Sequence, residues 1–107
     1  MALFSKKNLR KSLLEERTIR YEADSKIQTK WITANAESHD FSNGKGIIVL
    51  KEGTAEIGDF AFDGYSGLTS ITIPDSVTKI GERAFKWCSG LADDVRGTIE
   101  SINPRAL

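Results

Sequence analysis

Hydrophobic positions in the second half of the chain recur in a strand-like pattern. In "LTSITIPDSVTKIGERAF", which begins at Leu68, the apolar side chains of Leu68, Ile71 and Ile73 are expected to point inward while the polar residues between them face out. The Pro74-Asp75 pair then ends the strand with residues typical of turns. An opposite apolar wall would be closed by Val77, Ile80, Ala84, Phe85 and Cys88.

This block is one copy of a repeat. The segment "IGDFAFDGYSGL" from Ile57 returns as "IGERAFKWCSGL" from Ile80, at an offset of 23 residues and with 7 of 12 positions identical. The match extends backwards, because "GIIVLKEGTAEIG" from Gly46 lies over "TSITIPDSVTKIG" from Thr69. The repeating unit is therefore predicted to be a strand, a turn and a short helix-like segment. Gly58 and Gly81 are predicted to allow a close approach or a positive φ.

A third copy is degenerate. The C-terminal "SINPRAL" fits over "KIGERAF" if one residue is dropped, which places Val95 over Ile73 and makes the segment around Asp93 and Asp94 a last strand whose acidic residues discourage further pairing. A period in the low twenties with one extended segment is typical of a solenoid whose turns stack strand on strand. The fold class expected is an α/β or mainly β repeat with a parallel sheet.

The residues of the second copy carry a family resemblance. "LTSITIPDSVTKIGERAFKWCSGL" resembles the BspA-type leucine-rich repeat, and the resemblance covers residues 45–91 well and the tail more weakly. It implies a short leucine-rich-repeat solenoid with parallel strands, and a protein-binding or structural module without an active site. "TIRYEADSKI" from Thr18 and "FSNGKGIIVL" from Phe41 also resemble the segments that precede such repeats in proteins of gut Bacteroidales and their phages.

The chain departs from the family pattern in ways that bear on function. It holds few repeats, and Tyr65 stands where the family usually has the cysteine that Cys88 supplies in the next copy. The N-terminus does not read as a secretory signal, because its basic residues follow the apolar ones and no continuous apolar block comes after them. We therefore expect the chain to stay where it is made, which argues against a cell-surface adhesin.

Residues 5–17 fit a helix with Leu9 and Leu13 on one side and Ser5 as N-cap. Its charge order opposes the helix dipole, since Lys6 and Lys7 lie at the N-terminal end. Two interpretations stay open for this segment: a docking arm that anchors the chain, or a frayed terminus.

Residues 18–44 are expected to cap the open end of the solenoid. "TIRYEA" and "KIQTKWI" alternate around Asp24-Ser25, which predicts a β-hairpin, and Asn43-Gly44 predicts a loop or a second hairpin turn. The resulting domain division is an anchor arm at 1–17, a capping hairpin and loop at 18–44, and the solenoid at 45–107, with copies at 45–67, 68–90 and 91–107.

One strand is apolar on both faces, because the first copy has Ile47 and Val49 where the second has outward polar residues. Such a strand is normally covered on both sides, so either the hairpin with Trp31 and Ile32 or another chain is expected over it. We favour cover within the chain, since the hairpin is close in sequence. Trp87 is either a contact residue or a cover for the incomplete last turn, and the second interpretation is preferred.

Composition adds limits. A chain of 107 residues with 39% hydrophobic and 28% charged residues fits one small domain, and its longest apolar run, "IIVL", is too short for a membrane span. The net charge is zero, yet the first 20 residues carry six basic and two acidic side chains, hence +4 against −4 for the rest. This asymmetry is a modest hint of an anionic partner, with a solvated helix face as the alternative, and nucleic acid is not expected to be one.

Candidate chemistry is sparse. His39 is the only histidine and is interpreted as a surface residue of a polar loop, whereas Cys88 is interpreted as a buried, inert thiol with no partner for a disulfide or a zinc cluster. Lys45 lacks the phosphate-loop pattern around it, and the carboxylates form no recognisable pair. No enzyme activity, cofactor or metal is expected.

The sequence thus predicts a non-enzymatic module held in a larger assembly as a homo-oligomer or docked subunit. In its concrete form it is a phage virion component, such as a head fibre or decoration protein, located in the virion or the cytoplasm. The alternative is a cell-surface adhesin that binds host proteins. The candidate partner-binding residues are Leu3, Phe4, Lys6, Lys7, Leu9, Arg10, Leu13 and Trp87, and the candidate interface strand is that of Ile47 and Val49.

Overall fold

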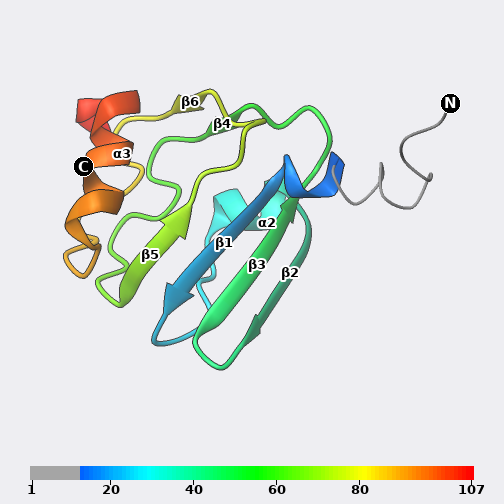
Figure 1. Ribbon diagram of the computed structural model, residues 1–107, viewed down its shortest axis with the longest axis horizontal. Coiled ribbons are helices and arrows are strands. Elements are labelled where there is room, and N and C mark those ends of the chain that lie inside the picture. Colours follow the sequence, from blue (N-terminus) through cyan, green and yellow to red (C-terminus); the bar gives the residue numbers. More distant parts are fainter. Residues whose placement is uncertain (1–12) are drawn as a thin grey trace, which may run out of the picture.

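The computed structural model describes residues 13–107 (Figure 1). Leu13 to Glu15 are helical and lead into the first strand. The elements that follow are β1 (Thr18–Ala23), α2 (Lys30–Asn35), β2 (Ala36–Ser42), β3 (Lys45–Leu50), β4 (Glu56–Ile57), β5 (Leu68–Thr72), β6 (Lys79–Ile80), α3 (Asp93–Ile102) and the 3-10 helix η1 (Pro104–Ala106).

The larger sheet, called the main sheet below, overturns the expected parallel solenoid. Its four strands have the order β2-β3-β1-β5, and every neighbouring pair is antiparallel. The strands of the two repeats, β3 and β5, run in the same direction but are not hydrogen-bonded to each other, because β1 lies between them. The prediction of a parallel-strand solenoid was therefore wrong, and the molecule is a small mixed fold with a mostly antiparallel sheet.

The main sheet contains the second hairpin turn predicted at Asn43-Gly44, but the first hairpin, predicted around Asp24-Ser25, was wrong. The second hairpin joins β2 to β3 through Asn43 and Gly44, whose φ angles of 51° and 77° suit the tight turn that Asn-Gly favours. Residues 26–32, predicted to be the second strand of the first hairpin, instead have no regular structure up to Thr29 and then enter helix α2. The Thr29 hydroxyl accepts a hydrogen bond from the Ile32 N–H at 3.0 Å and so caps the helix.

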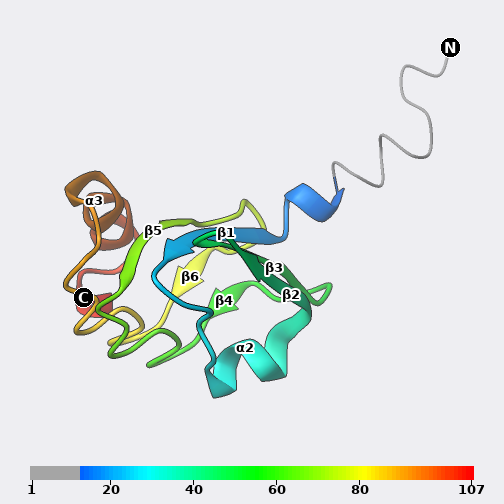
Figure 2. The ribbon, with the colours of Figure 1, turned by 90° about the horizontal axis from the view of Figure 1, so that it is seen from below.

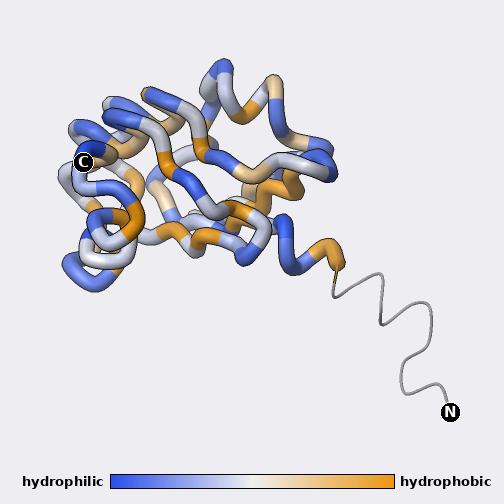
Figure 3. The backbone as a smooth tube through the Cα atoms, turned by 90° about the horizontal axis from the view of Figure 1, so that it is seen from above, coloured by the Kyte–Doolittle hydropathy of each residue, from blue (hydrophilic) through white to orange (hydrophobic). Residues whose placement is uncertain are grey.

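The opposite side of the molecule, called the turn wall below, consists of residues 56–65, 79–88 and 103–106. Here β4 and β6 pair in parallel, and the turns after them stack directly. The Phe62 N–H donates to the Ala84 carbonyl at 2.7 Å, and the Gly64 N–H donates to the Lys86 carbonyl at 2.8 Å. The third copy continues the stack, since the Phe85 N–H donates to the Ala106 carbonyl at 2.8 Å. Successive turns run side by side in Figure 3.

The third copy departs from the prediction over its first half. Its predicted last strand is helix α3, with Asp93 and Asp94 in the first turn, where carboxylates stabilise the helix dipole. The segments predicted to be helix-like after Gly58 and Gly81 are consecutive turns. The two glycines have no positive φ, but a Cβ on Gly81 would lie 2.5 Å from the Asp59 backbone nitrogen, so the predicted close approach is confirmed.

The core lies between the main sheet and the turn wall. Phe62 and Phe85 stack at its centre with ring centroids 5.1 Å apart and planes 7° apart. Most inward positions predicted from the repeat are confirmed, because Leu68, Ile71, Val77, Ile80, Ala84, Phe85 and Cys88 are all buried, whereas Ile73 is only partly buried. The largest fully buried side chains are Phe62, Phe85, Ile19, Ile27, Ile48, Leu50, Ile57, Leu68, Ile99 and Cys88.

Candidate protein-binding surfaces

The outer face of the main sheet, which looks away from the core, contains the candidate interface strand. Side chains of β3 alternate along the strand, so that Ile48 and Leu50 are fully buried while Ile47 is 37% exposed and Val49 is partly exposed. Trp31 and Ile32 lie elsewhere: Ile32 is buried in the core, and the Trp31 ring packs against Phe62 with centroids 5.9 Å apart. The expected cover of Ile47 and Val49 by the N-terminal hairpin was therefore wrong.

Polar residues flank this apolar stripe. Opposite Ile47 lie Arg20 of β1 on one side and Asp40 of β2 on the other. A shallow depression of about 380 Å³ adjoins Ile47, and its lining includes Arg20, Glu22 and Lys45. The outer face thus combines an apolar centre with charges of both signs around it.

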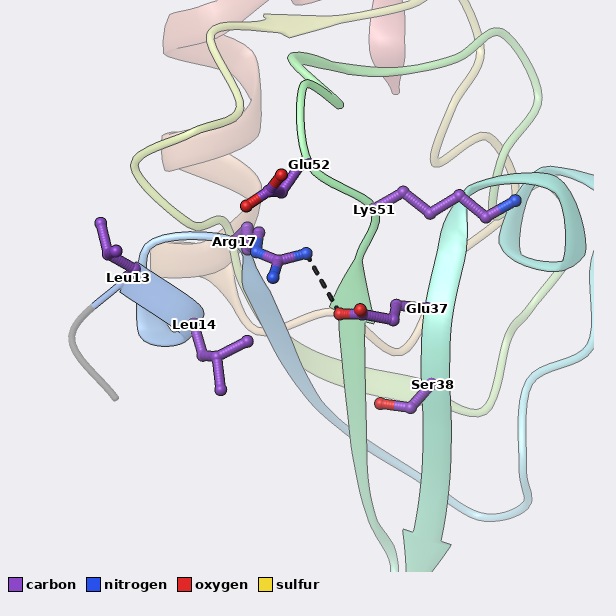
Figure 4. A pocket seen from close by; sticks show the side chains of 7 residues that line it. All are labelled: Leu13, Leu14, Arg17, Glu37, Ser38, Lys51 and Glu52. Carbon is purple, nitrogen blue, oxygen red and sulfur yellow. Dashed lines mark hydrogen bonds and ion pairs between the residues drawn. The ribbon is translucent and has the colours of Figure 1, made fainter. Parts of the chain in front are cut away.

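A second depression, of about 670 Å³, lies where the chain enters the main sheet (Figure 4). Arg17 crosses it, forming an ion pair with Glu37 at 3.1 Å and donating to the Leu50 carbonyl at 2.6 Å. Leu13 lies at its rim and is 53% exposed. Arg17 is part of the predicted anchor arm, so the last residues of that arm are bound to the body of the protein.

Exposed aromatic residues mark the turn wall. Trp87 is 70% exposed and has a φ of 66°, so the preferred interpretation of Trp87 as a core cover was wrong. Phe60 is 51% exposed with a φ of 61°, and the Arg83 guanidinium lies 5.9 Å from its ring centroid. Phe60 was not among the predicted site residues. Its equivalent in the second repeat, Arg83, has nearly the same φ of 57°.

His39 lies on β2 rather than in a loop, and it is half-buried. The Tyr21 hydroxyl is 2.7 Å from His39 Nε2 and accepts a hydrogen bond from the Ile27 N–H at 3.2 Å. Burial lowers the pKa of His39, with Lys26 adding to the effect, and burial raises the pKa of Tyr21. Because the proton of the Tyr21 hydroxyl is free to point at Nε2, this arrangement favours a neutral imidazole. The contact stabilises the inner face of the sheet.

Cys88 is a buried thiol, as expected. Its Sγ lies 3.0 Å from the Phe62 carbonyl, and burial raises the pKa of the thiol to about 11, which opposes the thiolate form that a nucleophile needs. Among residues 13–107, no group of three or more His, Cys, Asp or Glu side chains is arranged to hold a metal ion. Within the same part of the chain, no helix is long and apolar enough to cross a membrane.

The comparison with known protein families shows to which family the chain belongs. The family model described as "BspA type Leucine rich repeat region (6 copies)" matches residues 25–107. The chain belongs to the BspA-type leucine-rich-repeat family. Neither the curated proteins nor the solved structures yielded a match to this BspA-type chain.

Membership in this family agrees with the turn wall, where successive copies of the repeat stack on one another. It supports a repeat module of the kind that mediates protein interactions. Of the candidate partner-binding residues, Leu3, Phe4, Lys6, Lys7, Leu9 and Arg10 lie outside the described residues. Leu13 and Trp87 are both exposed but belong to different surfaces, the entry depression and the turn wall. Leu13 and Trp87 therefore do not form one continuous site.

Proposed function

We propose that this BspA-type leucine-rich-repeat chain is a non-enzymatic protein-binding module that docks on its partner through the outer face of the main sheet. The observation that carries the proposal is the side of β3 that no other part of residues 13–107 covers, where Ile47 and Val49 interrupt an otherwise polar surface. An apolar stripe framed by charged side chains loses unfavourable contact with water when a partner covers it. Arg20 and Asp40, which face Ile47 from the two neighbouring strands, supply polar contacts that fix orientation.

In its concrete form, the proposal is that the chain is a phage virion component, such as a head fibre or decoration protein. The support is the resemblance of the two segments around β1 and β3 to the lead-in of phage-borne repeats, together with the uncovered outer face. The chain would be held by a multi-protein assembly, and residues 1–17, with their excess of basic side chains, would add an anchor.

The test measures how much of the chain is present in purified virions. We expect the wild-type chain to copurify with virions at fixed stoichiometry, and Ile47→Lys to lower its content at least about tenfold, because a charge would be buried at the centre of the interface. Thr78→Lys is the matched control, since Thr78 is exposed and lies outside the outer face. Quantitative mass spectrometry of the particles and thermal melts of all three proteins provide the readout.

The alternative, a cell-surface adhesin, gives a different distribution. Recovery of the wild-type chain in the outer-membrane fraction, with no copies in particles, would contradict the virion role while leaving the binding face open to test against host proteins. Equal incorporation of wild type and Ile47→Lys would contradict the assigned face. Both outcomes are informative only if Ile47→Lys melts within a few degrees of wild type, as expected for a substitution at an exposed position.

A further inference from the structure

The free edge of β5 is the starting point of a second binding surface. Among residues 13–107, β5 is one of the two edge strands of the main sheet and pairs only with β1. Helix α3 lies beside this edge in two perpendicular views (Figures 1 and 2). Edge strands present unpaired backbone groups and can add a further strand.

The backbone of Ile71 faces this free edge. On β1, the Arg17 carbonyl and the Ala23 N–H are bonded toward β3, to Leu50 and Gly44, so the odd-numbered residues of β1 face β3 and the even-numbered ones face β5. Ser70 and Thr72, opposite Glu22 and Arg20, are therefore the hydrogen-bonded residues of β5. The N–H and C=O of Ile71 point the other way and have no backbone partner among residues 13–107.

The chain itself begins to pair with this edge and then leaves it. The Ala92 N–H donates to the Thr69 carbonyl at 3.1 Å, two residues before Ile71, on the edge that faces away from β1. Helix α3 starts at the next residue, Asp93, so the strand that would have continued the pairing is absent. A groove of about 360 Å³ follows, lined by Ser70 to Ile73 on one side and by Asp94, Val95, Thr98 and Ile99 on the other.

We propose that this groove between β5 and α3 binds an extended peptide segment of a partner protein by strand addition to β5. The lining alternates aliphatic side chains with hydroxyl groups, and its only ionisable side chain is that of Asp94. The complementary segment has apolar side chains at alternate positions and a Lys or Arg that faces Asp94. Main-chain hydrogen bonds to Ile71 supply affinity, and apolar contacts with the partly exposed Ile73 and Val95 supply specificity.

A second copy of the chain is a poorer occupant of this groove. Pairing β5 of one copy with β5 of another would bring a whole sheet and its own α3 against the edge, where α3 already stands. A single strand needs only the spacing of about 4.8 Å from β5 that strands adopt in a sheet. The groove therefore favours an isolated extended segment. The groove adjoins the depression on the outer face, because Ser70 and Thr72 line both, but it is tested at Ile71 and Asp94 and not at Ile47. The two proposals can therefore fail independently.

The test uses a synthetic peptide, acetyl-Lys-Thr-Ile-Thr-Ile-Thr-Lys-amide, and two versions methylated on alternate peptide nitrogens in opposite phase. A strand added to β5 uses the N–H groups of one phase only. We expect one methylated version to bind at least about tenfold more weakly than the other, because it loses hydrogen bonds worth about 1 kcal/mol each. Titrations followed by the amide resonances of β5 give the affinities, and hydrogen exchange of the Ile71 amide reports its protection.

Variants of the full chain test the charge. Asp94→Lys is expected to weaken binding of the peptide about two- to fivefold at low salt, the range of an exposed ion pair. Asp93→Lys is the matched control, since it lies in the same first turn of α3 but does not line the groove. Any loss of helix stability is shared by the two variants, so the difference between them measures the groove.

Equal affinity of the two methylated peptides would overturn the proposal, as would amide shifts confined to residues outside β5 and α3. Protection of the Ile71 amide that rises with protein concentration in the absence of peptide would instead assign the edge to a second copy and also overturn it. A phase difference, a shift of the Ile71 amide on peptide addition and a larger effect of Asp94→Lys than of Asp93→Lys would establish the site.

Discussion

The first two repeats contribute to both the main sheet and the turn wall, yet they meet in different ways on the two sides. In the turn wall they touch directly, as the Phe62 N–H bonds to Ala84 one copy later. In the main sheet β1 separates β3 from β5, so the same two copies stand two strand spacings apart, about 9.6 Å, instead of one. A repeat in sequence therefore specifies stacking only where no other segment competes for the backbone edge.

The difference extends to the kind of packing. The turn wall buries aromatic rings and leaves little room, since a Cβ on Gly81 would meet the backbone of the preceding copy. The main sheet instead contains a polar contact under its inner face, between Tyr21 and His39, and an uncovered apolar stripe on its outer face. The first region is suited to stability and the second to binding. The predictions below test this division, from the largest effect to the smallest.

Removing a stacked ring should break the turn wall. Phe62→Ala is expected to lower the free energy of unfolding by about 3–5 kcal/mol, because Phe62 is fully buried against Phe85. Phe60→Ala is the matched control, as Phe60 lies two residues away and is half exposed, and it should cost less than about 1 kcal/mol. Chemical denaturation measures both, and similar losses for the two would contradict the assigned core.

Adding a methyl group where the copies touch should also destabilise the turn wall. Gly81→Ala places a Cβ 2.3 Å from Asp59 Oδ1 and 2.5 Å from the Asp59 nitrogen, so we expect a loss of about 1–3 kcal/mol. Gly97→Ala provides the opposite sign, because nothing lies within 4 Å of its Cβ and the residue is inside α3, where alanine is favoured by about 0.5–1 kcal/mol. Denaturant midpoints that move in the same direction would refute this packing.

Relief of backbone strain should stabilise the chain by a smaller amount. Trp87 occupies the left-handed region, where its repeat equivalent is Gly64 with a φ of 85°. Trp87→Gly is expected to raise the free energy of unfolding by about 0.5–1 kcal/mol, since the left-handed conformation costs a non-glycine residue about 1–2 kcal/mol and the Lys86 contact with the ring returns part of it. A thermal melt checks the sign, and a destabilised variant would show that Trp87 packs more than its exposure indicates.

The smallest expected effect is a pH dependence of the main sheet. Because burial lowers the pKa of His39 in the folded state, the unfolded chain takes up the proton first as the pH falls. The contribution of His39 to the free energy of unfolding is therefore fully present above the ordinary histidine pKa of about 6.5. It decreases as the pH falls through that value toward the lower pKa of the folded state. His39→Gln should flatten the change between about pH 7 and pH 5, as measured by urea denaturation across that range.

The turn wall could be predicted from the sequence because its partners are copies of one another. Identical residues at Ile57 and Ile80, and at Ala61 and Ala84, occupy equivalent buried sites, so the alignment of the repeats also gives the contacts between them. The buried state of Cys88 followed from the same alignment.

The main sheet could not be predicted in this way, because alternation identifies a strand but not its neighbours. The pattern of Thr18 to Ala23 indicated β1, yet nothing local shows that it lies between β3 and β5. Two helices were missed for different reasons. For α3, the repeat alignment outweighed the acidic first turn at Asp93 and Asp94. For α2, the alternation assigned through Trp31 outweighed the N-cap signal of Thr29, after which the helix begins.

The outer face could be predicted from the sequence only in part. The two apolar faces of β3 were visible in Ile47 and Val49, but the expected cover was not, because sequence proximity does not decide on which side of a sheet a segment packs. Trp31 and Ile32 instead serve the core, where helix α2 places them on the inner side.

The insertion of β1 between the repeat strands is tested most directly by nuclear Overhauser effects between α-protons. In antiparallel sheets these protons approach closely at the non-hydrogen-bonded pairs, which here are Arg20 with Ile47 and Tyr21 with Ile71. The account predicts strong α-proton contacts for both pairs. Direct backbone contacts between β3 and β5, such as Ile48 with Ile71, and none from β1 to either strand, would contradict it and restore a parallel stack on this side of the molecule.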